Sequence, residues 1–258
     1  MLPGCVYHLT HRCHNRSFLF RFARDRTEYR RRLRQAVKQF DVSLLTYSIT
    51  SNHTHLVLTA GEPETISRML QKLEGEFAEY YNRRKKRSGA FWEGRYWCTM
   101  VDVGDYVWNC MKYIDLNMVR AGAVEHPSQW RWCGYPEWAG ERQRYRLLDM
   151  EQAVKQCGGG SVEAFRSNYT AGIAEAVEHR EMVRQPCWTE SIAVGSESFV
   201  RGIEELTQRR REMVVEETAP SQWTVREARS DYNAFSTGKN DSNGSPAHAG
   251  IGYFTESQ

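Results

Sequence analysis

Two histidines separated by a single residue, His53 and His55, are the side chains of this chain best suited to binding a metal ion. In an extended strand, side chains two residues apart point to the same face, about 6.6 Å from each other along the strand. Two imidazoles placed in this way can share one divalent cation, but they do not decide which one. The same pattern also occurs where histidines only hydrogen-bond or face solvent, so the pair alone does not establish a metal site.

A second pair, Tyr113 and Asn117, has the spacing of neighbours on one face of a helix. An asparagine oxygen beside two imidazoles would make a third ligand and would favour Mg²⁺ or Mn²⁺. A tyrosine beside such a metal could attack a phosphodiester, although a phenol with a pKa near 10 needs activation at neutral pH. The chain has 13 tyrosines, so a half-buried helix tyrosine is the simpler interpretation of Tyr113 taken alone.

The elements that must position these residues can be predicted from periodicity. Residues 5–13 are expected to form a strand, and residues 25–40 a helix with Asp25 as its N-cap. Residues 42–50 and 53–59 are expected to form a hairpin, in which the histidines lie on the face opposite the leucines of the second strand.

The pattern then continues with a helix over residues 65–84, a strand over 91–103 and a helix over 105–119. The order β-α-β-β-α-β-α predicts an α+β fold built on an antiparallel sheet of about four to five strands, close to the split-βαβ (ferredoxin-like) arrangement.

Three segments are expected along the chain. Residues 1–148 hold all the motifs described above and form the predicted catalytic domain. Residues 149–235 form a mainly helical C-terminal extension, broken by glycines 158–160 and by Pro186. Residues 236–258 are rich in Gly, Ser and Asn and are expected to be disordered.

The charge is distributed unevenly. Residues 1–150 carry 24 Lys and Arg against 16 Asp and Glu, whereas residues 151–258 carry 11 against 16. A basic first half favours a polyanionic partner such as nucleic acid. The candidate phosphate contacts are Arg12, Arg16, Arg83, Arg84, Lys85, Lys86, Arg87 and Arg95. The aromatic residues 91, 92 and 96 beside Arg95 could stack on unpaired bases or could form core.

Composition bears on the location of the protein and on whether it holds disulfides or a second metal site. No window approaches eighteen apolar residues and no signal peptide is visible, so a cytoplasmic protein without a membrane partner is expected. The seven cysteines include no CxxC pair, and their spacing supports neither a zinc knuckle nor a disulfide framework. His8, His11 and His14 do not make a second metal site, because His11 points the other way and the other two lie far apart.

Four blocks of the sequence together resemble a known family. They are residues 3–10 (PGCVYHLT), 51–58 (SNHTHLVL), 91–96 (FWEGRY) and 113–122 (YIDLNMVRAG). In this order and spacing, over residues 3–135, they are similar to the single-tyrosine HUH transposases, and more specifically to the REP-associated tyrosine transposases.

The resemblance implies roles for the residues singled out above. The two HUH ligands fall on His53 and His55, the nucleophile on Tyr113 and the third ligand on Asn117. It implies an enzyme that binds single-stranded or hairpin DNA and cleaves it through a covalent 5′-phosphotyrosine, leaving a free 3′-OH that can rejoin strands. A homodimer, with the tyrosine helix acting in cis or exchanged, is left open.

Two departures from the family pattern stand beside the ligands. Met118 replaces the proline that usually follows the asparagine, and Thr50-Ser51 replaces Met-Pro before Asn52. Neither departure touches a proposed ligand, so they bear on substrate details more than on chemistry. A domesticated hairpin-binding protein that no longer cuts, and a histidine-metal phosphodiesterase that uses water, are the alternatives.

Overall fold

The computed structural model describes residues 2, 4–180, 183–207 and 212–228. Its first half follows the predicted order, and a second set of shorter elements comes after it. The first-half elements are β1 (Val6–Arg12), α1 (Ala23–Gln39), β2 (Ser43–Ile49), β3 (His53–Thr59), α2 (Pro63–Lys85), β4 (Trp97–Val101), α3 (Asp105–Asp115) and α4 (Asn117–Arg120). The later ones are α5 (Tyr135–Trp138), α6 (Met150–Gln156), α7 (Val162–Glu178), α8 (Cys187–Glu190), β5 (Ala193–Gly195), α9 (Glu197–Thr207), β6 (Met213–Ala219) and β7 (Gln222–Glu227).

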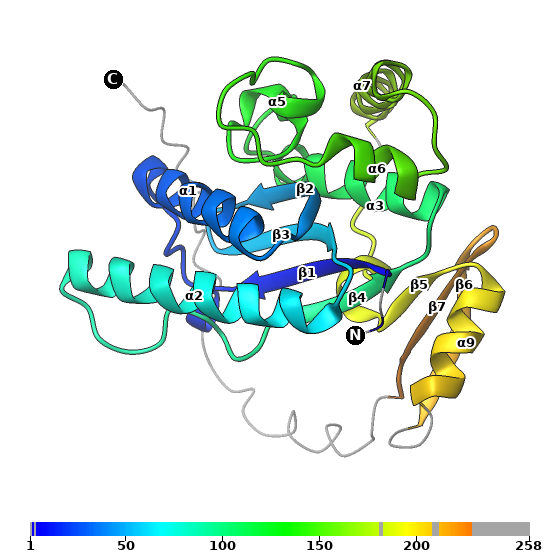
Figure 1. Ribbon diagram of the computed structural model, residues 1–258, viewed down its shortest axis with the longest axis horizontal. Helices are drawn as coiled ribbons and strands as arrows, with labels where there is room; N and C mark the ends of the chain where they lie inside the picture. Colours follow the sequence, from blue (N-terminus) through cyan, green and yellow to red (C-terminus); the bar gives the residue numbers. More distant parts are fainter. Residues whose placement is uncertain (1, 3, 181–182, 208–211, 229–258) are drawn as a thin grey trace, which may run out of the picture. The chain divides into compact units, whose positions relative to one another are not determined.

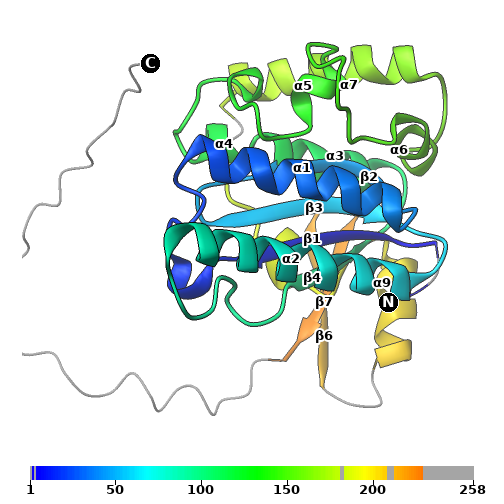
Figure 2. The ribbon, with the colours of Figure 1, turned by 60° about the vertical axis from the view of Figure 1, so that its left-hand side comes forward.

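The first four strands pair in the order β2-β3-β1-β4, and every neighbouring pair is antiparallel. This is the strand order of a split-βαβ fold, with β3 inserted between β1 and β2. Figures 1 and 2 show α1 and α2 side by side across one face of this sheet. The central strand β3, which carries both histidines, therefore has a paired strand on each side.

The sheet separates two apolar layers because successive side chains of a strand point to opposite faces. On one face, Leu56 and Leu58 of β3 pack with residues of α1 and α2 such as Leu33 and Phe77. On the other face, Val57 packs with α3 and with helices of the extension. His53 and His55 share the parity of Val57, so the fold directs them towards the side of α3.

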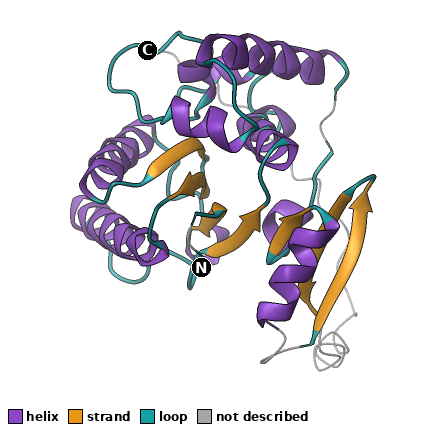
Figure 3. Ribbon diagram, turned by 45° about the vertical axis from the view of Figure 1, so that its right-hand side comes forward, coloured by secondary structure: helices purple, strands orange, loops and turns teal. Residues whose placement is uncertain are grey.

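The sheet is larger than the sequence predicts. Over the described residues it contains seven strands in the order β2-β3-β1-β4-β5-β7-β6, and β4 pairs with β5 in parallel, so the prediction of four to five antiparallel strands was wrong. The three added strands come from the segment expected to be mainly helical. They extend the sheet beyond β4, whose outer edge would otherwise expose unpaired backbone groups. Figure 3 shows α9 beside the β6–β7 hairpin.

Several predicted boundaries also differ. The strand expected over residues 91–103 is only β4, because Gly94 takes a positive φ of 63° and the segment before it runs as a loop. The helix expected over residues 105–119 is interrupted at Leu116, where ψ is 0°. The N-cap of α1 is Phe22, and not Asp25 as the sequence predicts. The buried carboxylate of Asp25 forms an ion pair with Arg84 of α2 instead.

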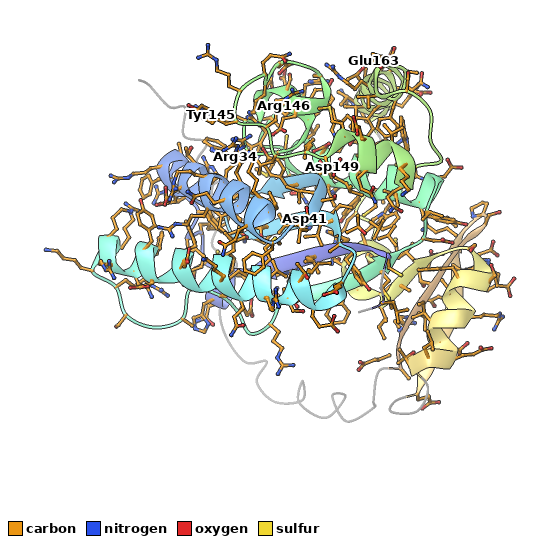
Figure 4. The ribbon with its side chains drawn as sticks, viewed as in Figure 1. Arg34, Asp41, Tyr145, Arg146, Asp149 and Glu163 are labelled. Carbon is orange, nitrogen blue, oxygen red and sulfur yellow. The ribbon has the colours of Figure 1, made fainter. Side chains whose placement is uncertain are left out.

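The segment between α5 and α6 is fastened to the first half of the chain. In Figure 4, Tyr145 and Arg146 lie beside Arg34 of α1. Arg34 Nε donates to the carbonyl oxygen of Arg146 at 3.3 Å, and its guanidinium lies 5.5 Å from the ring centre of Tyr145. Asp149 accepts a hydrogen bond from Ser43 at 2.6 Å and caps α6.

Residues up to Glu227 form one compact unit. The domain boundary predicted after residue 148 stays a prediction, and the tail predicted to be disordered lies outside the described residues. Within the described parts of the chain, no helix combines the length and apolar character needed to cross a membrane.

Candidate active site

The two histidines of β3 lie on the same face of the sheet, as strand parity predicts. Their ring centres are 4.7 Å apart, and the two rings are nearly perpendicular at 86°. His55 is buried and His53 is half-buried. On the neighbouring strand, Thr10 lies across from His55, and Arg12 lies across from His53.

His53 is held through its Nδ1 atom. This nitrogen lies 2.7 Å from Asn52 Oδ1 and 3.0 Å from Thr50 Oγ1. Both partners belong to the turn between β2 and β3, so the chain segment that precedes the histidine also orients its ring. The other ring nitrogen, Nε2, is the one left for a ligand.

His55 has polar neighbours on both sides of its ring. Its Nδ1 lies 2.9 Å from Nε2 of His8 and 3.1 Å from Thr10 Oγ1. Its Nε2 lies 3.3 Å from Nδ2 of Asn117, which is 62 positions later in the chain. The fold therefore brings the second histidine and the predicted third ligand into contact.

Burial keeps these imidazoles neutral. It lowers the pKa of His53 to about 4, with further lowering from the charges of Arg12, His8 and Arg120. Burial also lowers the pKa of His55 well below its ordinary value, with His53 the next contributor. A neutral imidazole has a free lone pair and is the form that binds a metal ion.

The donor set at this position consists of two imidazoles and one amide. No three His, Cys, Asp or Glu side chains gather into a possible metal site among the residues that the structure describes. A cation here would thus depend on Asn117 as the third protein ligand. An amide can present either N–H or oxygen at one place, so His53, His55 and Asn117 fit a divalent ion that keeps sites open for phosphate oxygens.

Tyr113 occupies the last turns of α3 and is largely buried. The guanidinium of Arg120 lies 3.9 Å from the centre of its ring, and the indole of Trp188 lies 6.3 Å away. Burial raises the pKa of Tyr113, while the positive charge of Arg120 opposes that rise. The tyrosine also lines a pocket of about 210 Å³ with Asn109 and Gln185.

Three of the predicted DNA contacts gather in one groove. Arg12, Arg16 and Arg95 line a volume of about 540 Å³, together with the exposed indole of Trp97. Thr10 also lines this groove, and its hydroxyl contacts His55. The arginine-lined groove therefore adjoins the histidine pair.

The basic cluster at the end of α2 is placed elsewhere. Arg84 pairs with buried Asp25, and Arg83 pairs with Glu79 on the surface. Arg87 donates to the side-chain oxygen of Asn82 and to backbone carbonyls of the following turn. The ammonium group of Lys85 lies over the ring of Phe22, and Lys86 is exposed. None of these five residues lines the arginine groove. Arg84 and Arg87 form contacts within the protein that stabilise the fold.

The aromatic residues next to Arg95 divide between core and surface. Phe91 is buried in the core between α1 and α2. Trp92 stacks on His11 with ring centres 4.4 Å apart, and Tyr96 is half-buried. The aromatic side chain that faces the groove is instead Trp97, which the sequence analysis did not select.

Sequence reasoning also missed His8, Arg120 and Trp188. His8 and Arg120 lie inside the blocks that carry the family resemblance, so the blocks themselves were a usable signal. His8 was considered only with its neighbours in sequence, whereas its partner His55 lies across the β1–β3 pairing. Nothing in the sequence pattern indicated that Trp188 returns to the site.

A family model matches the part of the chain that holds most of the motif blocks. Residues 2–117 match a family model described as "Transposase IS200 like". The chain is similar to the structure of a REP-associated tyrosine transposase bound to a REP hairpin, with 16% identity and a TM-score of 0.44, over 57% of this chain and 85% of that one. It is also similar to a Deinococcus radiodurans protein provisionally assigned as a transposase, with 19% identity and a TM-score of 0.31, over 36% and 75% of the two chains. No protein of curated function matches the sequence.

Proposed function

We propose that this chain, whose residues 2–117 match the model of the IS200-like transposase family, cleaves and rejoins single-stranded or hairpin DNA through a covalent tyrosine intermediate. The observation that carries the proposal is the 3.3 Å contact between Asn117 and Nε2 of His55. It joins the histidine pair to the end of the tyrosine helix, which is the juxtaposition that the motif blocks imply. The finer assignment, to the REP-associated tyrosine transposases, is part of the proposal.

In this proposal His53, His55 and Asn117 hold a divalent cation, Mg²⁺ or Mn²⁺. When bound, such a cation polarises the scissile phosphate as a Lewis acid and helps to orient it. The protein's own contribution is two neutral imidazoles, whose low pKa values keep their lone pairs available, and an amide at the start of α4.

The nucleophile is the phenolic oxygen of Tyr113. It forms a bond to phosphorus while the bond from phosphorus to the 3′ oxygen breaks, which leaves a 5′-phosphotyrosine and a free 3′-OH. The phenol gives up its proton and the departing 3′ oxygen gains one. Attack by a 3′-OH on the phosphotyrosine reverses the step, so strands can be joined without a nucleotide cofactor. The charge of Arg120 over the ring favours the phenolate that this step requires.

The DNA backbone is proposed to follow the arginine groove. Arg12, Arg16 and Arg95 would contact phosphates, and Trp97 would stack on an unpaired base. Exposed members of the cluster at the end of α2, such as Arg83, Lys85 and Lys86, would act as peripheral contacts.

One assay tests the proposal against both alternatives. A labelled hairpin with single-stranded flanks is incubated with the protein and Mg²⁺ or Mn²⁺, then resolved on a denaturing gel. We expect a covalent protein–DNA adduct that is lost in Tyr113→Phe and kept in Tyr106→Phe, a matched change on the same helix. Cleavage that survives Tyr113→Phe would refute the tyrosine mechanism in favour of water attack. Binding without cleavage by the wild-type protein would favour the domesticated binder.

A second variant separates chemistry from binding. His53→Ala should abolish adduct formation while leaving the affinity for the hairpin largely unchanged, because the phosphate contacts come from the arginine groove. Equal loss of cleavage and binding would mean that His53 supports the fold rather than the reaction.

A further inference from the structure

A chain of buried polar contacts leads from His55 into the C-terminal extension. His8 Nε2 lies 2.9 Å from His55 Nδ1, and His8 Nδ1 lies 2.7 Å from the carbonyl oxygen of Trp188 in α8. All three residues are buried. The carbonyl oxygen at the end of this chain can only accept a hydrogen bond.

That acceptor determines where the protons of both imidazoles lie. His8 must carry its proton on Nδ1 in order to donate to Trp188. His8 is completely buried and no carboxylate is among the polar groups that contact its ring, so the ring is neutral and has only this one proton. His8 Nε2 is therefore an acceptor, and His55 must donate to it from Nδ1. The remaining nitrogen of His55, Nε2, then bears a lone pair.

The hydroxyl of Thr10 fits the same assignment. It lies 3.1 Å from His55 Nδ1 and 3.3 Å from His8 Nε2. A hydroxyl can accept one hydrogen bond and donate another. Thr10 can thus accept from His55 while donating to His8, and the Nδ1 proton of His55 is then shared between two acceptors, His8 Nε2 and Thr10 Oγ1.

A second relay of the same kind serves His53. Asn52 Nδ2 donates to the carbonyl oxygen of Arg16 at 3.2 Å, which fixes the orientation of the amide and turns its Oδ1 towards His53 Nδ1 at 2.7 Å. Thr50 donates its hydroxyl proton to the carbonyl oxygen of His53, so towards Nδ1 it too is an acceptor. His53 therefore carries its proton on Nδ1.

We infer that His8 and Asn52 are positioning residues that set both histidines in the Nδ1–H form, each through a relay that ends on a backbone carbonyl. Both Nε2 atoms thereby bear lone pairs before any cation arrives, and that of His55 accepts from Nδ2 of Asn117 at 3.3 Å in this structure. One relay ends on Trp188, which gives the extension a part in preparing the site. The use of these lone pairs rests on the proposed metal site, whereas the proton positions do not.

Nitrogen-15 NMR of the ring atoms in the wild-type, metal-free protein at neutral pH tests the proton positions directly. Signals are assigned by single His→Gln variants. We expect His8, His53 and His55 to show a protonated Nδ1 and an unprotonated Nε2. A proton on Nε2 of either His53 or His55 would overturn the inference. This measurement needs no DNA and no activity, so a protein with the expected forms that fails to cut hairpins would refute only the proposed function.

Mn²⁺ affinity, followed by electron paramagnetic resonance, tests the positioning role. His8→Leu removes the acceptor and should weaken Mn²⁺ binding about 10- to 100-fold, the usual effect of losing a partner of a ligand histidine. His8→Gln can return an acceptor oxygen and should stay within a few-fold of the wild type, as should the control His179→Gln at the end of α7. Unchanged affinity in a folded His8→Leu would refute the role. If that variant does not fold, the wild-type NMR result decides.

Discussion

Arg120 holds Tyr113 from two directions. Its guanidinium lies 3.9 Å from the centre of the tyrosine ring, and its Nη2 donates to the carbonyl oxygen of Tyr113 at 3.1 Å. The same charge also lowers the pKa values of both His53 and His55. One side chain of α4 thus acts on the nucleophile and on the ligand pair, although no motif spacing had singled it out.

Replacing Arg120 should therefore raise the pKa of Tyr113 and slow cleavage. Burial raises the pKa of Tyr113, and the guanidinium of Arg120 is the strongest of the charges that lower it. Each unit by which the pKa increases reduces the phenolate fraction about tenfold at fixed pH. For Arg120→Gln we expect adduct formation at neutral pH to fall about tenfold or more, and its pH profile to move to higher pH. Arg120→Lys, which keeps the charge, should recover part of the rate. A slower variant with an unshifted profile would contradict the electrostatic role.

Arg95 and Arg83 provide a test of where DNA binds. Both side chains are exposed arginines, but Arg95 lines the groove beside the histidines, whereas Arg83 pairs with Glu79 on the surface of α2. Arg95→Ala should weaken hairpin binding and reduce the slope of log affinity against log salt by about one. Arg83→Ala should change both quantities much less. Equal effects would place the DNA along α2 and not along the groove.

The sequence was most informative where local periodicity decides the structure. The order of the first seven elements follows from helix and strand patterns, and the parity of β3 correctly placed His53 and His55 opposite Leu56 and Leu58. The contact of Asn117 with His55 could be expected only from the family blocks, because helix spacing says nothing about which strand the helix will cover.

The rest depended on long-range pairing that no local pattern encodes. β5 has only three residues, and its parallel partner β4 lies more than ninety positions earlier. His8 meets His55 through the register of β1 against β3, and Trp188 reaches the same place from the extension. Such contacts are determined by how whole elements pack, so single-sequence reasoning had no means of locating them.

The buried neutral state of His8 predicts a dependence of stability on pH in the metal-free protein. Its folded pKa of about 4 lies below the unfolded value near 6.5, so in this interval the unfolded chain binds more protons. The contribution of His8 is fully present above pH 6.5 and is lost as the pH falls towards 4. Urea unfolding of the wild type and of His8→Gln should show the difference between their unfolding free energies shrinking by about 2 kcal/mol from pH 7 to pH 5. A constant difference would mean that His8 is not kept neutral by the fold.

Loss of the Glu137 side chain should cost the fold much more than loss of an exposed ion-pair partner. Its carboxylate is fully buried, lies 2.9 Å from Nη2 of Arg30, and accepts hydrogen bonds from the backbone N–H groups of Leu147 at 2.7 Å and Leu148 at 3.1 Å. Glu137→Ala would leave the mostly buried Arg30 without its carboxylate and two backbone donors without an acceptor. We expect the unfolding free energy to fall by about 3–5 kcal/mol in urea titrations. Glu79→Ala, which breaks an exposed pair with Arg83, should cost less than about 1 kcal/mol. Similar costs for the two variants would contradict this structural role of Glu137.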